Sequence, residues 1–339
     1  MPDENQVTEN QHYEPLYTIQ PEKPKKRGLG VFLNTILFAA TFISTTLAGV
    51  QWLNRDPYDL NNFKYGLTYS ILIMFFLSCH EFGHYFAAKI HKVKVTLPFY
   101  IPFPLFLNPF GTMGAVIRMK SPTHSRKTLF DIGIAGPVAG FIAAVGMLIY
   151  GMTHLPPFEY IYSIHPEYQM TGIPLSGNFS FGQTAIYWTL SKLFTSSPDV
   201  FLPPMNEVYH YPFLCVGWFG LLVTALNLLP VGQLDGGHIT YALLGNKHKI
   251  VARAFFGIML GLGLIGLAQL GLSYFDIEFL PGTGFLNWLI WSLLIFFVIK
   301  IEHPPFYDPE PIGLKRKLWG VFALFMFAAS FTPTPFNNL

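Results

Sequence analysis

The chain has 339 residues, of which 51% are hydrophobic and only 12% charged, and its net charge is +2. Soluble domains carry about a quarter charged residues, so this composition excludes an ordinary water-soluble globule and favours a membrane protein. It also excludes a disordered chain, which needs low hydrophobicity, and a nucleic-acid binder, which needs a basic face.

Apolar runs of about 20 residues are long enough to cross a bilayer as helices. Such runs predict an all-α polytopic membrane protein with about seven transmembrane helices, at 29–53, 66–90, 129–152, 211–230, 251–272, 284–301 and 317–333. Residues 29–333 would form a single membrane domain. A disordered cytoplasmic tail is expected at 1–28 and a C-terminal tail at 334–339.

Basic residues fall mainly on one side of this arrangement. With seven alternating spans, most of the 21 basic residues lie on the side of the N-terminus, and the exceptions are Arg55, Lys64 and Lys192. Because basic residues concentrate in cytoplasmic segments, we expect the N-terminus in the cytoplasm. Residues 153–210 then form a long outer loop, with a surface helix predicted at 184–194.

Residues 95–120 are apolar but rich in proline and glycine, which prevents a continuous helix. Irregular backbone at membrane depth is tolerated only where protein or a water-filled cavity satisfies its polar groups. We therefore predict that this segment forms a re-entrant loop or a small β-hairpin within the bundle.

The second predicted span contains the sequence HEFGH, which places His80, Glu81 and His84 on one helix. Residues four apart share a helix face, so both imidazoles can reach one metal ion while Glu81 handles a proton beside them. Ionisable side chains inside a membrane are costly unless they are paired or metal-bound. The alternative is that both histidines are packing residues that form hydrogen bonds across helices, beside a protonated Glu81. The presence of three ionisable residues at this spacing favours the metal site over that alternative.

A catalytic zinc site generally takes three protein ligands and leaves a fourth position for water. The sequence NLLPVGQLDGGH, from Asn227 to His238, offers Asp235 as a third ligand where proline and glycines interrupt the fourth span. His238 is a rival ligand that spacing alone leaves open. An Asp-Gly pair is also common in turns, so a purely structural role is the alternative for Asp235.

Four segments together resemble the site-2 protease family of intramembrane zinc metalloproteases, peptidase family M50, and they are HEFGH, GTMGAVI, DIGIAGPVAG and NLLPVGQLDGG. The resemblance covers about residues 66–245, which would form the catalytic core. It implies that His80, His84 and Asp235 bind one Zn²⁺, that Glu81 is the general base, and that Asn227 stabilises the developing oxyanion. It also implies that residues 111–117 present an edge strand to an unwound substrate. The outer loop shows no PDZ-like pattern, so the chain is closer to the bacterial and plastid members that lack this domain.

The resemblance implies hydrolysis of a peptide bond in or near a transmembrane helix of a membrane-protein substrate, as in regulated intramembrane proteolysis. Its partners would be that substrate and the lipid bilayer. A metal-ion transporter and an inactive protease-like scaffold that binds membrane helices are the competing interpretations. The N-terminal tail lacks the Arg/Ser-rich character of a transit peptide, so we expect a bacterial inner membrane with the active site toward the cytoplasm. The sequence does not indicate an oligomeric state.

Overall fold

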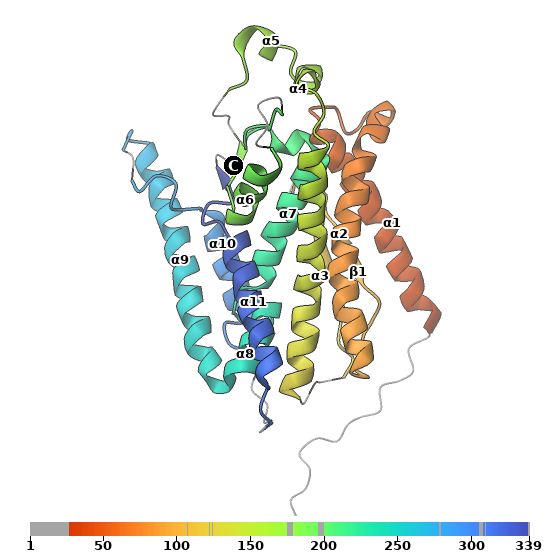
Figure 1. Ribbon diagram of the computed structural model, residues 1–339, viewed down its shortest axis with the longest axis vertical. Coiled ribbons are helices and arrows are strands. Elements are labelled where there is room, and N and C mark those ends of the chain that lie inside the picture. The colour runs from red at the N-terminus through yellow and green to blue at the C-terminus, as the bar shows by residue number, and fades with distance from the viewer. Residues whose placement is uncertain are drawn as a thin grey trace, which may run out of the picture.

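A computed structural model describes residues 27–337 except 107, 122, 124, 175–178, 196–199, 278, 305–307 and 309. The tail predicted at residues 1–28 therefore lies almost entirely outside the described residues. The long helices run side by side along the long axis of the molecule (Figure 1). Helices α4 (Glu159–Ile164) and α5 (Tyr168–Thr171) lie at one extreme of this axis, the α4–α5 end, and α8 (Asp235–Leu244) lies toward the other, the α8 end.

Within the described residues, four helical segments are long and apolar enough to cross a membrane. The first three coincide with α1 (Arg27–Gln51), α2 (Phe63–Ile90, preceded by η1, Leu60–Asn62) and α3 (Arg126–Thr153). The fourth runs from α8 through the short η3 (Gly245–Lys247) to the end of α9 (His248–Ser273). The structure is thus mostly helical, with four candidate membrane-spanning segments.

The number of seven spans is not confirmed, because the other three predicted spans form shorter helices. Helix α7 (Pro212–Asn227) has 16 residues and ends before the proline-containing break that precedes α8. Helix α10 (Asn287–Leu294) has eight residues and continues as the π-helical η4 (Ile295–Ile299). Helix α11 (Leu314–Ser330) has 17 residues and three consecutive basic side chains in its first turn. Pro230 lies in the break that ends α7, and the three basic residues in the first turn of α11 make that helix less apolar.

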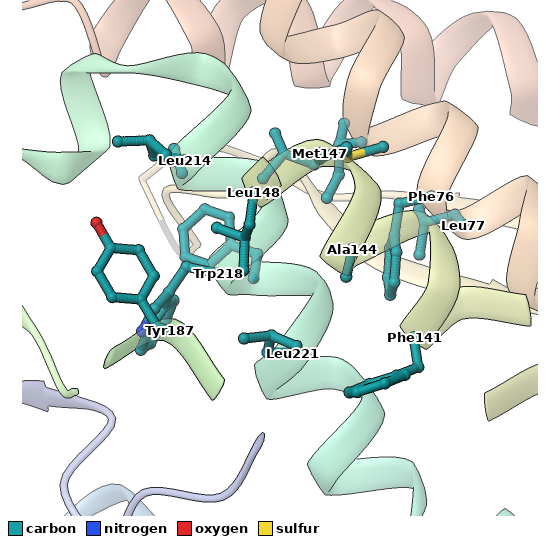
Figure 2. Close-up of a cluster of buried hydrophobic side chains, with 14 of the residues drawn as sticks. Phe76, Leu77, Phe141, Ala144, Met147, Leu148, Tyr187, Leu214, Trp218 and Leu221 are labelled. Carbon is teal, nitrogen blue, oxygen red and sulfur yellow. The ribbon is translucent and has the colours of Figure 1, made fainter. Parts of the chain in front are cut away.

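The core forms where α2, α3 and α7 pack together. Figure 2 shows Phe76 of α2, Leu148 of α3 and Trp218 of α7 among its side chains, and all three are fully buried. The Trp218 indole donates a hydrogen bond of 2.8 Å to the Gly182 carbonyl and stacks on Phe181 with ring centroids 4.4 Å apart. The core therefore extends from the long helices to the segment that precedes α6 (Ala185–Phe194), the helix predicted at 184–194.

The segment predicted as a re-entrant loop or hairpin contains an antiparallel pair of strands, β1 (Phe99–Pro102) and β2 (Thr112–Val116), with Tyr100 opposite Ala115. Side chains of the neighbouring helices hold this hairpin. The Ser44 hydroxyl of α1 donates to the Gly111 carbonyl at 2.6 Å, and the hydroxyls of Ser78 in α2 and Tyr100 are 2.7 Å apart. The hairpin is therefore fixed beside the part of α2 that carries the HEFGH sequence.

A second two-stranded sheet joins distant parts of the chain. Strand β3 (Ser180–Phe181), within the predicted outer loop, pairs antiparallel with β4 (Phe336–Asn337), within the segment predicted as a C-terminal tail. The described part of that loop also contains α4, α5, α6 and η2 (Val208–His210). This region is consequently built from several short elements that pack against the ends of the long helices.

Candidate metal centre

Helix α2 places the imidazoles of His80 and His84 one turn apart in the interior of the bundle. Both side chains are buried, and their Nε2 atoms are 3.1 Å apart. The Nδ1 atom of His84 lies 2.7 Å from the Ile132 carbonyl of α3. Because a carbonyl can only accept, Nδ1 carries the hydrogen and Nε2 presents its lone pair, the usual arrangement of a metal-ligating histidine.

Asp235 reaches the two histidines from the first turn of α8. Helix α7 ends at Asn227, and the chain bends through residues 228–234 before α8 begins. The bend requires close backbone contact, because a Cβ at Gly236 would overlap the Leu228 carbonyl and a Cβ at Gly237 would overlap that of Gly232. This tight break directs the Asp235 carboxylate back into the bundle, toward the two histidines.

The three donor atoms fit a zinc ion in type and in spacing. The Asp235 Oδ2 atom is 3.3 Å from Nε2 of His80 and 3.2 Å from Nε2 of His84. Zinc bonds of about 2.0–2.1 Å in a tetrahedron place neighbouring ligand atoms about 3.3–3.4 Å apart. Two imidazoles and one carboxylate also form a common catalytic zinc set. His238, the rival ligand, is not in this group, and its Nδ1 atom instead lies 2.9 Å from Nε2 of His303.

Glu81 and Asn227 border the group of three donors. Glu81 is buried next to His80, and its carboxylate accepts a hydrogen bond from the Ile117 backbone, directly after strand β2. The Asn227 amide nitrogen at the end of α7 lies 3.3 Å from Nε2 of His80. The structure thus brings together all five residues that the sequence selected.

The contacts of α3 with the two histidines and of the Ile117 backbone with Glu81 were not predicted from the sequence. The spacing of the small residues in GIAGPVAG favours close helix packing, and the sequence assigns them no role at the metal centre. However, a Cβ at Gly136 would overlap the His84 imidazole, and one at Gly140 would be 3.1 Å from Nδ1 of His80. The spacing of these glycines could have indicated a close approach, but it could not show that the neighbours are the two histidines. Nothing in the sequence marked the backbone groups of Ile132 and Ile117.

Comparison with known proteins supports the same interpretation. The family described as "Peptidase family M50" matches residues 68–270. The rice (Oryza sativa subsp. japonica) protein "Probable zinc metalloprotease EGY1, chloroplastic" is 31% identical over 75% of this chain and 38% of its own length. "Probable zinc metalloprotease EGY2, chloroplastic" of Oryza sativa subsp. indica is 26% identical over 96% of this chain and 54% of its own length, and that of Arabidopsis thaliana is 25% identical over 82% and 44%.

The chain thus spans about two fifths to half of the length of these curated relatives. No solved structure shows significant similarity to it. The relatives are named as chloroplastic, so the comparisons give no support to the predicted bacterial inner membrane. The family match covers more than half of the chain and includes every residue of the candidate site. The chain therefore belongs to peptidase family M50, the site-2 protease family that its motifs predicted.

Proposed function

We propose that this protein is an intramembrane zinc metalloprotease that cleaves a peptide bond in or near a transmembrane helix of a membrane-protein substrate. His80, His84 and Asp235 would hold the zinc ion. The observation that carries the proposal is the convergence of these donors, at 3.1–3.3 Å from one another, next to a buried carboxylate among apolar helices. Such a set is costly in this environment unless a cation compensates it.

The residues around the donors supply the remaining chemistry. When bound, zinc acts as a Lewis acid that polarises a carbonyl and lowers the pKa of water. Glu81 would accept a proton from the attacking water at its carboxylate and later donate it to the leaving amine. Asn227 would donate a hydrogen bond from its amide to the carbonyl oxygen as negative charge develops there. The contact of Asn227 with His80 supports this position.

A transmembrane substrate must unwind before attack, because a helix hides its peptide bonds in its own hydrogen bonds. We propose that strand β2 receives the unwound segment as an added strand, which would satisfy the exposed amides. Two observations support this step. Met113 and Val116 of β2 are exposed, and a Cβ at Gly114 would meet no atom within 4 Å. The hydrogen bond from Ile117 to Glu81 joins the end of this strand to the proposed base.

The apolar helices and the similarity to chloroplastic relatives support association with a membrane. We further propose that the N-terminus and the active site face the cytoplasm of a bacterial inner membrane. The distribution of basic residues supports this orientation, since they concentrate on the side of the N-terminus.

Substitution of Glu81 by Gln tests the proposal directly. Purified wild-type protein is expected to cleave a model transmembrane substrate, and Glu81→Gln is expected to keep its zinc but lose cleavage by about 10²–10⁴-fold. The exposed Glu310, whose carboxylate pairs with Lys127, provides the control Glu310→Gln, which should retain full activity. Undiminished cleavage by Glu81→Gln would refute the assignment of the base. A zinc-loaded wild type that cleaves nothing would instead favour a scaffold or a transporter.

A further inference from the structure

A second group of metal-type donors lies at the α4–α5 end of the molecule, far from α8 (Figure 1). It consists of His165 at the end of α4 and of Glu207 and His210 in the segment before α7. We propose that these three side chains bind a second divalent metal ion of the zinc type. This inference stands independently of the proposed proteolytic function, because it rests on other residues.

The hydrogen bonds of the two histidines direct both free nitrogens toward each other. Nδ1 of His210 lies 2.6 Å from the Trp52 carbonyl, and Nδ1 of His165 lies 2.8 Å from the Glu167 carboxylate. The side chain of Glu167 is 56% exposed, and an exposed carboxylate is ionised near neutral pH and can only accept hydrogen bonds. Both Nδ1 atoms therefore donate, and both Nε2 atoms present lone pairs.

These two Nε2 atoms are only 2.9 Å apart. Two lone pairs at this distance repel each other unless a cation lies between them. Either a metal ion binds both rings, or one ring becomes an imidazolium that shares its proton with the other. A histidine that ligates a metal through Nε2 commonly donates Nδ1–H to a carboxylate or a backbone carbonyl, and each of these acceptors occurs here.

The carboxylate of Glu207 favours the metal ion. Its Oε1 atom accepts hydrogen bonds from the Tyr168 hydroxyl at 2.8 Å and from the Asn206 amide at 3.3 Å. Its Oε2 atom is buried without a hydrogen-bond partner and lies 3.4 Å from Nε2 of His210. The Glu207 side chain is only 2% exposed, so leaving this oxygen unpaired is costly. A cation at the centre of the group would satisfy it together with both imidazoles.

Two imidazoles and one carboxylate are the donors that zinc commonly takes in proteins. An ion at this position would connect α4, the segment before α7 and, through the Trp52 carbonyl, the end of α1. Its expected role is to fasten the α4–α5 region to the long helices. The side chain of His165 is 15% exposed, so the ion can enter from the surface.

Metal analysis of the full-length protein tests the proposal. After saturation with zinc and removal of the excess, the wild type is expected to hold two zinc ions per chain. The variant His80→Ala/His84→Ala is expected to retain one, and X-ray absorption at the zinc edge should show two imidazole ligands for it. A wild type with one ion, or a folded double variant with none, would overturn the proposal and favour the shared proton.

Two further substitutions in the double variant locate the remaining ion. His165→Ala removes one imidazole. Glu207→Gln preserves the size of the side chain and its hydrogen bonds at Oε1, so it still tests the site if His165→Ala folds poorly. Each is expected to eliminate the remaining zinc and the rise in thermal stability that zinc produces. His154→Ala, an exposed histidine stacked on Tyr150 at the same end of the molecule, should retain both. Zinc retained by folded Glu207→Gln with unchanged affinity would exclude Glu207 as a ligand.

Discussion

Gly136 of α3 lies directly against the His84 imidazole of α2, so closely that a Cβ would overlap the ring. Gly136→Ala should therefore displace the imidazole from Asp235 and weaken zinc binding by more than about 100-fold. This loss exceeds the roughly 10–100-fold typical of mutating a residue that only orients a metal ligand, because here the ligand itself moves. Zinc titration of the purified variant measures this loss. Gly146→Ala is the matched control, because it lies on the same helix where a Cβ would meet nothing within 4 Å. Equal zinc affinity in the two variants would contradict this packing.

Asn227 is expected to act on the reaction and not on zinc binding. Removal of one oxyanion donor costs about 10²–10³ in kcat in other hydrolases, so Asn227→Ala should lose about this factor with little change in KM. Its zinc content should equal that of the wild type, since the amide lies beside His80 and is not one of the three donors. Steady-state cleavage and metal analysis together measure both quantities. Loss of zinc in parallel with activity would show that Asn227 positions His80 instead.

Substrate is expected to contact strand β2. A photoreactive amino acid at Met113 or Val116, both exposed on this strand, should cross-link to a transmembrane substrate in the inactive Glu81→Gln protein. The same group at Leu267 of α9, which is similarly exposed, should not. Mass spectrometry of the adducts identifies the contact. Efficient cross-links at Leu267 with none at β2 would place the substrate elsewhere and refute strand addition.

Trp218 is expected to be important for stability. Trp218→Phe removes the hydrogen bond to the buried Gly182 carbonyl and reduces the stacking on Phe181, so it should cost about 1–3 kcal/mol and lower Tm. Trp188→Phe on α6 is the control, since that side chain is 50% exposed. Thermal unfolding in detergent, followed by circular dichroism, compares the two variants. An equal Tm for both would show that the indole nitrogen contributes nothing measurable.

The part of the site that depends on local geometry could be predicted from the sequence. His80 and His84 are four residues apart and therefore share a helix face wherever that helix lies. Asp235 was the leading third ligand because it is the acidic residue in the segment where proline and glycines interrupt a predicted span. The hairpin followed from prolines that forbid a helix. These features depend on the conformational limits of a few neighbouring residues.

The remaining features depend on contacts between distant segments. The hydrogen bond from His84 to the Ile132 carbonyl and that from the Ile117 N–H to Glu81 use backbone groups, which every residue possesses and no motif marks. The number of seven spans is unconfirmed for a different reason. Hydropathy measured how apolar the runs near α7 and α11 are, but it did not show that α7 ends at Asn227 or that α11 takes three basic residues into its first turn.

The bend between α7 and α8 has a consequence for how the protein is made. His80 and His84 are synthesised early, whereas Asp235 is synthesised only after α3 and α7. The nascent chain therefore carries two of the three proposed donors for much of its translation. Stable capture of the ion is expected to await the folding of α8 against α2, so metal acquisition would be a late step of biogenesis that reports on completed assembly.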